Sequence, residues 1–384
     1  MHNKPEIVFT LPACMGGVAS FNYNIVNHSR LIKNFHSKVI LLRAVEDSRA
    51  MFLDKFNADE VIIFNYSHKE NQYYVQKRLS ELLGNESGAI VTDNSLTIVA
   101  AKVFKNPKTV FHLVHDYFYV TQNIQLGDLV DVSIAHSSFF SDAVFASDPN
   151  LFFNRSFYIP YGVQQLPKQP IKDNAILNLV FLGRLDEGKG VMLLKKIEDQ
   201  LKEKNLNVHW TIIGKGPLKE SLVEQWKHNQ NISFEQPDTT DEVYTILNMQ
   251  DIFIFSTSFE GTPVSILECL ANGVVTITND LPGGIRDIVK EGIGYRCELN
   301  NLSEFTEKII TLNNNRTLLK QMQQNCFQLS ANHYNIENNA DNYFRIFMQY
   351  ETFKRKTKNK SIKMSRLDNL IFPNEFVKFF RSIK

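Results

Sequence analysis

The sequence predicts an α/β protein with two doubly wound parallel-sheet domains. Short runs rich in valine, isoleucine and phenylalanine alternate with longer segments of helical periodicity, which is typical of parallel sheets covered by helices. This alternation is interrupted at residues 159–170, where three prolines and a glycine break any regular element, and then it restarts. A chain of 384 residues is long enough for two domains with separate cores.

The apolar runs set the expected strands of each domain. We expect an N-terminal Rossmann-like domain over residues 1–163 and a C-terminal Rossmann-like domain over residues 164–340, with helices in 341–384 returning to the first domain. The first set of predicted strands comprises residues 6–11, 38–42, 60–64, 89–92, 109–114 and 132–135. The second set comprises residues 177–182, 208–213, 232–235, 252–255 and 274–278.

Composition and charge exclude several classes of protein. Lys and Arg total 42 against 41 for Asp and Glu, so no global positive charge favours nucleic acid, and no nucleic-acid partner is expected. The polar start and the short apolar run after it do not fit a signal peptide, so we expect a cytoplasmic location. The four cysteines form no C-x-x-C pair, which favours buried thiols over a disulfide framework or a metal site.

The most informative segment is 258–273, SFEGTPVSILECLANG, which follows one predicted strand and opens a helix. Thr262 is the expected helix N-cap and Pro263 the expected first helical residue. The backbone N–H groups at such a helix start suit a diphosphate. Glu260 and Glu268 can face one polar ligand. Apolar neighbours place part of the helix in the interior, where the Glu268 carboxylate needs hydrogen-bond donors that sugar hydroxyls would supply. Two acids at this spacing are also compatible with a solvated pair.

A second segment, 181–190, carries two cations just beyond a predicted strand. Arg184 and Lys189 can neutralise the two phosphates of a leaving nucleoside diphosphate, Arg184 as a fork and Lys189 as a point charge. That charge matters most as the bond to the sugar breaks. A surface turn with solvated cations is the alternative interpretation.

Segment 258–273 resembles the E-x7-E motif of family 4 glycosyltransferases, whose GT-B fold has two Rossmann-like domains facing a central cleft. The resemblance implies that Glu260 contacts hydroxyls of the donor sugar and that Glu268 binds the ribose. Segment 181–190 is similar to the family's G-R-L…K-G signature, and residues 283–289 are similar to its glycine-containing loop. The likeness is strong over residues 177–289 and loose over the first domain.

The same resemblance extends to three further loops. Gly214 opens a G-x-G-P turn near the nucleotide, although a plain turn would use the same residues. Gly16 and Gly17 resemble the family's N-terminal glycine loop, before a helix expected near Ala19. The residues expected to bind the donor are Gly16, Gly17, Arg184, Lys189, Gly214, Gly261, Thr262, Pro263 and Glu268, and those expected in catalysis are Glu260, His115, Arg184 and Lys189.

His115 follows the predicted strand 109–114 and resembles the family's H-D or H-N site. The resemblance implies that His115 hydrogen-bonds the donor sugar, with Asp116 orienting the ring. His112 points to the opposite face of the strand and is expected to be structural. Asp93 follows another predicted strand and is expected either to contact the acceptor or to cap a helix.

Taken together, the resemblance implies a retaining, metal-independent glycosyltransferase. It would move a sugar from a UDP- or GDP-linked donor to a hydroxyl of a glycan or lipid-linked acceptor in cell-surface polysaccharide or lipopolysaccharide synthesis. The nucleotide sugar is a co-substrate, and no cofactor is expected. A catalytically inactive sugar-nucleotide-binding or scaffold subunit is the alternative. An NAD-linked oxidoreductase would need G-x-G-x-x-G with an acid ending the second strand, and neither domain has that combination.

The segment 354–381 differs in kind from the rest of the chain. Residues 354–366 include seven bases and no acid, and residues 370–381 mix apolar and basic side chains. Two interpretations fit this pattern. One is peripheral contact with an anionic membrane, at its inner face. The other is an ordinary terminal helix packed on the first domain, with Lys and Arg on its wet side.

Overall fold

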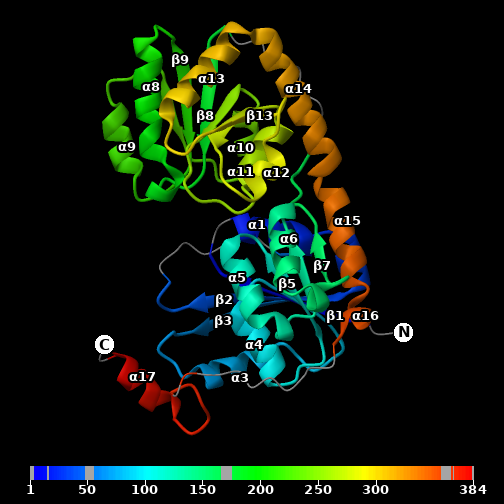
Figure 1. The fold of residues 1–384 in the computed structure, drawn as a ribbon. Helices are drawn as coiled ribbons and strands as arrows, with labels where there is room; N and C mark the ends of the chain where they lie inside the picture. Colours follow the sequence, from blue (N-terminus) through cyan, green and yellow to red (C-terminus); the bar gives the residue numbers. More distant parts are fainter. Residues whose placement is uncertain are drawn as a thin grey trace. The chain divides into compact units, whose positions relative to one another are not determined.

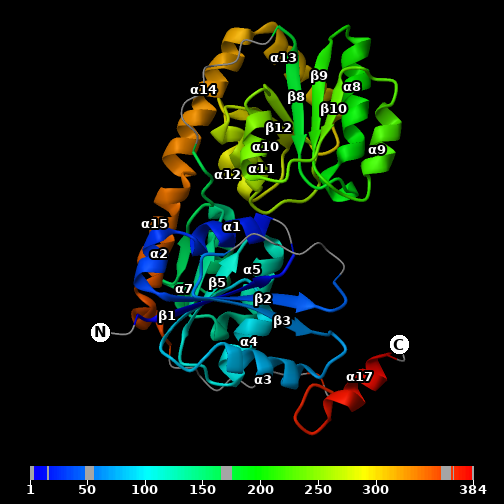
Figure 2. The same ribbon diagram turned by 180° about the vertical axis from the view of Figure 1, so that it is seen from behind.

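The computed structural model describes residues 4–14, 17–47, 56–165, 175–355, 365 and 367–382. The chain forms two compact units, Met1–Pro160 with Glu337–Lys384, and Tyr161–Ile336. Each unit is a parallel sheet with helices on both faces, as Figures 1 and 2 show from opposite sides. The predicted fold class of two doubly wound α/β domains is therefore confirmed.

The first unit contains a sheet of seven parallel strands in the order β3-β2-β1-β4-β5-β6-β7. Six of these were predicted to within two residues at either end, and β7 was not, because three half-buried or exposed residues carry too little periodicity. The strands are β1 (Glu6–Pro12), β2 (His36–Ala44), β3 (Glu60–Tyr66), β4 (Gly88–Thr92), β5 (Thr109–Val114), β6 (Val132–Ala135) and β7 (Ser156–Tyr158).

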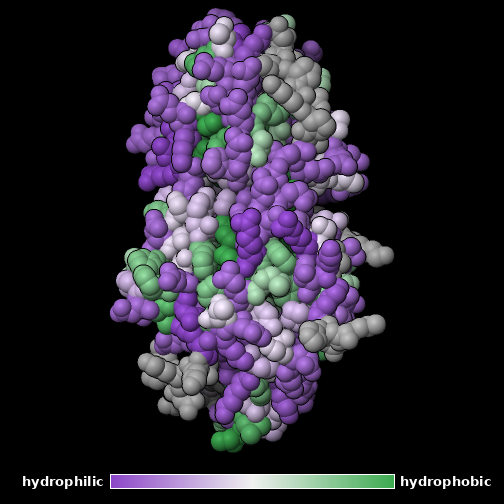
Figure 3. Space-filling view, turned by 90° about the vertical axis from the view of Figure 1, so that its right-hand side faces the viewer, coloured by the Kyte–Doolittle hydropathy of each residue, from purple (hydrophilic) through white to green (hydrophobic). Residues whose placement is uncertain are grey.

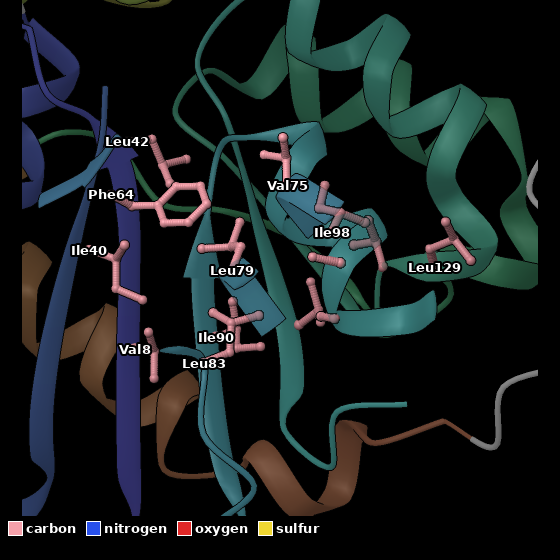
Figure 4. Close-up of a cluster of buried hydrophobic side chains, with 14 residues drawn as sticks. Val8, Ile40, Leu42, Phe64, Val75, Leu79, Leu83, Ile90, Ile98 and Leu129 are labelled. Atoms are coloured by element: carbon pink, nitrogen blue, oxygen red, sulfur yellow. The ribbon is translucent and has the colours of Figure 1, made fainter. Parts of the chain in front are cut away.

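Alternate residues of these strands enter two different cores. Val8 and Val110 face one side of the sheet, where they pack with Leu79 of α3 and Ile98 of α4 (Figure 4). The helices of this unit are α1 (Gly17–Val26), α2 (Ser29–Asn34), α3 (Gln72–Leu82), α4 (Ser95–Val103), α5 (Tyr117–Leu126), α6 (Ser138–Ser147), α7 (Pro149–Phe152), α15 (Ile336–Phe347), α16 (Tyr350–Phe353) and α17 (Asn374–Ser382).

The opposite face of the first sheet is covered by the last part of the chain. Phe347 of α15 meets Phe9 of β1 and Phe111 of β5 edge to face, with ring centroids 6.1 and 5.3 Å apart. All three rings are buried. Aromatic pairs of this geometry add to the stabilisation from burial alone, so residues beyond 336 complete the core of the first unit.

The second unit contains six parallel strands in the order β10-β9-β8-β11-β12-β13. Edge strand β13 was not predicted, because its four residues include a half-buried tyrosine and an exposed arginine. The strands are β8 (Leu177–Leu182), β9 (Val208–Ile213), β10 (Ile232–Glu235), β11 (Ile252–Phe255), β12 (Val275–Asn279) and β13 (Gly294–Cys297). The helices are α8 (Leu194–Glu203), α9 (Lys219–Trp226), α10 (Thr240–Leu247), α11 (Val264–Ala271), α12 (Gly284–Ile288), α13 (Leu302–Asn314) and α14 (Arg316–His333).

The strand order creates one switch point in each sheet. In the second unit β8 and β11 are neighbours, and the chain leaves them toward opposite edges of the sheet. In the first unit β1 and β4 stand in the same relation. Loops that follow the carboxyl ends of such a pair of strands diverge and leave room for a ligand. The loops after β8 and β11, and those after β1 and β4, are thus where the fold favours binding.

Candidate active site

A lysine and a glutamate form an ion pair at the switch point of the second unit. The Lys189 Nζ atom, at the end of the 3-10 turn η2 (Glu187–Lys189), forms an ion pair with Glu260 Oε1 in the loop after β11. The two side chains are 23% and 9% exposed. The Thr257 hydroxyl lies 3.2 Å from the same carboxylate oxygen. Two residues predicted to act in catalysis are therefore in direct contact.

Local backbone geometry holds Lys189 at this point. Asp186 Oδ1 accepts a hydrogen bond of 3.1 Å from the Lys189 backbone N–H, which caps the turn. Gly190 follows with φ of 67°, and a Cβ atom there would lie 2.1 Å from the Ser256 carbonyl oxygen. Only glycine allows the loops after β8 and β11 to approach this closely. The position of Lys189 relative to Glu260 therefore depends on Gly190.

Burial and charge act in opposite directions on Glu260. Burial is the larger effect and raises the pKa of this carboxyl, whereas the charges of Lys189 and Arg184 lower it. The Lys189 Nζ also lies 5.6 Å from the centre of the Phe255 ring, over its face. Arg184 is more open, with 65% of its side chain exposed and its guanidinium paired with Asp186. The site thus has one half-buried cation and one cation exposed to solvent.

Glu268 lies on α11 with its side chain partly exposed. Desolvation raises the pKa of its carboxyl to about 7. Burial, and after it the nearby Glu268 charge, raise the pKa of Tyr244. None of the residues that the structure describes donates a hydrogen bond to the Glu268 carboxylate. This carboxyl is thus ready to accept hydrogen bonds from a bound molecule.

The start of α11 differs from the prediction. The helix begins at Val264, and Pro263 precedes it as the N-cap in an extended conformation, with ψ of 110°. Thr262 was expected as the N-cap and Pro263 as the first helical residue, and both assignments were one residue too early. The cause lies in a tertiary contact: the Gly284 N–H donates to the Gly261 carbonyl over 3.0 Å, which holds this loop extended before the helix.

The remaining glycines of the second unit allow close packing between loops. Gly214 has φ of 151°, and a Cβ atom there would lie 1.9 Å from the Gly183 carbonyl oxygen. A Cβ on Gly216 would lie 2.4 Å from the Leu185 carbonyl oxygen. The loop after β9 therefore rests directly on the loop that carries Arg184. These contacts explain the G-x-G-P pattern by packing, and ligand contact by Gly214 stays a prediction.

A buried histidine and carboxyl meet at the switch point of the first unit. His115 follows β5, and its Nε2 atom lies 3.7 Å from Oδ2 of Asp93, which follows β4. The ring of His115 is stacked on that of His136, with centroids 4.6 Å apart. Burial lowers the pKa of His115 well below its ordinary value and raises the pKa of Asp93 to about 7.

The two carboxylates near His115 differ in part from the roles expected for them, and acceptor contact by Asp93 stays a prediction. Asp116 caps α5, accepting a hydrogen bond of 2.7 Å from the Phe118 N–H, so its carboxylate serves the helix rather than His115. Asp93 does not cap α4, because Asn94 does so through the Leu96 N–H. The Asp93 carboxylate, from a neighbouring strand, is the one that approaches His115, and sequence spacing carries no signal for that contact.

His112 is part of a buried polar network, as expected for a structural residue. Its two ring nitrogens lie 2.8 Å from the side chains of Asn123 and Gln122. Gly17 begins α1, two residues before the predicted start, and Gly16 lies outside the described residues. Within the described ranges, no cluster of three His, Cys, Asp or Glu side chains is arranged to hold a metal ion.

Residues 164–328 match the family described as glycosyl transferases group 1. The matched residues make up most of the second unit, which is therefore similar to group 1 glycosyl transferases. A curated relative is the UDP-Gal:alpha-D-GlcNAc-diphosphoundecaprenol alpha-1,3-galactosyltransferase of Escherichia coli, 24% identical over 44% of this chain and 45% of its own length. The poly(ribitol-phosphate) alpha-N-acetylglucosaminyltransferase of Staphylococcus aureus is 21% identical over 43% of this chain and 34% of its own length. The chain spans less than half the length of these two relatives.

Solved structures resemble nearly the whole chain. HepE of Anabaena, in complex with UDP and glucose, is superimposed with a TM-score of 0.71 and 13% identity, covering 90% of this chain and all of HepE. Sucrose-phosphate synthase of Thermosynechococcus elongatus gives 0.73 and 12%, covering 91% of this chain and all of the synthase. These likenesses show the fold. The resemblance to GT-B glycosyltransferases is confirmed, and the matched residues 164–328 include the Lys189–Glu260 pair.

Proposed function

We propose that the chain is a retaining glycosyltransferase that uses a UDP- or GDP-linked sugar and transfers it to a hydroxyl of a glycan or lipid-linked acceptor. The observation that carries this proposal is the contact of Lys189 with Glu260 at the switch point of the second unit. A cation beside a carboxylate suits the junction between a diphosphate and a sugar. The cation binds the negative diphosphate, and the carboxylate accepts hydrogen bonds from the sugar hydroxyls. The HepE complex with UDP and glucose supports a donor of this class.

In the proposed reaction, the acceptor oxygen attacks the anomeric carbon from the face that the diphosphate leaves. The bond between that carbon and the phosphate oxygen breaks, and its electron pair goes to the departing diphosphate, which also takes the proton of the acceptor hydroxyl. Lys189 and Arg184 stabilise the negative charge that develops on the diphosphate. We propose that these two cations do this without a metal ion.

Each glutamate has a separate role in donor binding. Glu260 accepts hydrogen bonds from the sugar hydroxyls, and its contact with Lys189 fixes the carboxylate before the donor arrives. The Lys189 ammonium has three N–H donors, so it can contact Glu260 and a phosphate at once. Glu268 binds the ribose, whose hydroxyl groups donate hydrogen bonds to the Glu268 carboxylate. Gly261, Thr262 and Pro263 form the backbone around the diphosphate at the start of α11.

The names of two relatives support the proposed acceptor and location. The Escherichia coli relative is named for an acceptor linked to diphosphoundecaprenol, and the Staphylococcus aureus relative for poly(ribitol phosphate). We therefore place the reaction in cell-surface polysaccharide or lipopolysaccharide synthesis, at the cytoplasmic face of a membrane. We propose that His115 hydrogen-bonds the donor sugar and that Asp93, which lies beside it, contacts the acceptor.

A transfer assay with a panel of UDP- and GDP-linked sugars tests the proposal. We expect Glu260→Gln to lower the rate by about 10²-fold or more, because the transferred sugar loses a charged hydrogen-bond partner. Glu187→Gln, an exposed acid on the adjoining turn, is the matched control and should leave the rate unchanged. A wild-type chain that binds UDP but transfers no sugar would instead support the inactive-subunit alternative.

A further inference from the structure

Residues 367–382 form a hook that the polar groups of α3 hold against the first unit. The hook ends in α17 and lies next to the N-terminal end of α3 in both ribbon views (Figures 1 and 2). The buried Asn71 side chain donates to the carbonyl oxygens of Asn369 and Phe372, over 2.9 and 2.7 Å. The Asn71 backbone N–H donates to Asn374 Oδ1 over 2.8 Å.

A second set of polar contacts holds the two ends of the hook together. Arg381, in the last turn of α17, places its Nη2 atom 2.9 and 2.8 Å from the two carboxylate oxygens of Asp368, and its Nη1 atom donates to the Glu70 carbonyl. The Asp368 carboxylate accepts a further hydrogen bond from the Gln72 N–H. Hydrogen bonds between a guanidinium and a carboxylate are stronger than those between neutral groups. The hook is therefore anchored by its charged and amide groups.

The apolar side chains of the hook point to solvent instead of into the unit. Val377 is buried, whereas five larger apolar residues are exposed. Figure 3, seen from the side opposite α17, shows a small group of hydrophobic residues at the lowest point of the first unit. The exposed residues and their exposed fractions are Leu370 62%, Ile371 83%, Phe376 44%, Phe379 62% and Phe380 48%.

This arrangement reverses the usual one for a surface helix. Phe376, Phe379 and Phe380 stand at positions i, i+3 and i+4 and so share one face of α17. The rings of Phe376 and Phe380 are already in contact, with centroids 4.6 Å apart. A surface helix ordinarily turns such a face toward the core. An apolar cluster that polar anchors hold in water marks a surface for a partner.

Basic side chains beside the apolar cluster favour an anionic membrane over a second copy of the chain as the partner. Lys77 and Lys378 line the crevice between α3 and α17, together with Arg78, Glu70 and Glu81. Arg78 is paired with Glu70. In the sequence, the seven bases of residues 354–366, most of them outside the described residues, precede the hook. Two copies of the chain joined through this surface would bring Lys77 and Lys378 of both copies together, whereas anionic headgroups would attract these lysines.

We propose that the apolar face of residues 370–380 inserts into the interfacial region of an anionic lipid bilayer. The aromatic and aliphatic side chains would enter the boundary between headgroups and acyl chains, and the neighbouring lysines would lie at headgroup level. Within the described ranges, no helix has the length and apolar character needed to cross a bilayer. The contact is thus peripheral, and it does not depend on the proposed transfer reaction.

Vesicle sedimentation tests this proposal without any donor sugar. The full chain is mixed with vesicles of phosphatidylcholine containing phosphatidylglycerol, and with vesicles of phosphatidylcholine alone. We expect binding to the anionic vesicles that weakens with salt, and at least about a tenfold loss of binding in the triple variant Ile371→Ser, Phe379→Ser, Phe380→Ser. Phe153→Ser, which replaces a 67% exposed phenylalanine elsewhere in the same unit, should bind as wild type.

Charge and oligomeric state are examined with the same proteins. Lys77→Glu with Lys378→Glu should lower binding to the anionic vesicles only. Unchanged thermal unfolding of the triple variant shows that the exposed positions do not support the fold. The proposal is overturned by a wild-type chain that stays unbound at low salt, or by a triple variant that binds vesicles as wild type does. A triple variant that loses self-association in sedimentation velocity while keeping vesicle binding would assign the surface to a second copy.

Discussion

Lys189 and Glu260 are 71 residues apart in the chain and form an ion pair between two neighbouring loops of the second unit. The pair is half-buried, and burial raises the pKa of the Glu260 carboxyl despite the lysine. A lysine held by a carboxylate before any ligand binds is preorganised for a diphosphate. The contact therefore makes the roles of both residues open to direct tests.

Replacing Lys189 by methionine should lower kcat by about 10²- to 10³-fold, because the leaving diphosphate loses its half-buried cation. The variant should also lose about 1–2 kcal/mol of stability, since Glu260 keeps a partly buried carboxylate without its partner. Lys195→Met is the matched control: its side chain is 20% exposed and pairs with Asp199 on α8. Steady-state rates and thermal unfolding check both effects. Equal kcat values for the two variants would contradict the role of Lys189.

Glu268→Gln should stabilise the protein at pH 8 and weaken its binding of UDP. Because the pKa of Glu268 is raised to about 7 in the folded state, the folded chain binds more protons than the unfolded chain between about pH 4.5 and 7. Wild-type stability therefore falls as pH rises through this window. We expect a gain of about 1–2 kcal/mol at pH 8 and none at pH 4, after discounting for solvent.

Urea unfolding at pH 4, 6 and 8 measures this gain, with Glu307→Gln on α13 as an exposed control. A pH-independent difference between Glu268→Gln and wild type would show that Glu268 is not desolvated. An unchanged affinity of Glu268→Gln for UDP would show that Glu268 is not part of the nucleotide site.

Replacement by asparagine should change the free energy of unfolding at pH 8 in opposite directions at Asp93 and Asp131. Both side chains are 2% exposed, but Asp131 accepts hydrogen bonds of 2.8 Å from Lys102 and from the Val110 N–H. The Asp93 carboxylate is buried and its pKa is raised to about 7. Asp93→Asn should therefore raise stability at pH 8 by about 1–2 kcal/mol, whereas Asp131→Asn should lower it by a similar or larger amount.

The stability difference at Asp93 should disappear below about pH 4, where its carboxyl is protonated in both states. Denaturant unfolding across pH measures it. A loss of transfer in Asp93→Asn with retained stability would support a part in acceptor recognition. Destabilisation at pH 8 would mean that the charged form of Asp93 is satisfied in the fold.

UDP or GDP should raise the thermal unfolding midpoint, because a ligand that binds only the folded state stabilises it. At 100 times its Kd the nucleotide contributes about 2.7 kcal/mol. The proposal of metal-independent binding predicts that excess EDTA leaves this shift unchanged. Arg184→Ala should reduce the shift, and Arg316→Ala, which removes an arginine at the start of α14, should not. A shift that requires added Mg²⁺ would overturn the metal-independent mechanism.

The sequence by itself determined the strands that carry strong apolar runs. The runs ending at Val114, Leu182 and Phe255 each became a buried strand, because a strand covered on both faces needs apolar residues throughout. The polar residues just beyond these ends were therefore correctly placed in loops at one edge of each sheet. Strands β7 and β13 were missed, since short strands with polar or exposed residues carry no such run.

Only the tertiary structure decided which polar groups meet. His115 is approached by Asp93 from a neighbouring strand, while the adjacent Asp116 caps a helix. Residues 367–382 pack on the first unit, but with their aromatic side chains exposed. The physical reason is that burial of apolar runs depends on local periodicity, whereas the partner of a carboxylate or an aromatic face depends on contacts between segments distant in sequence.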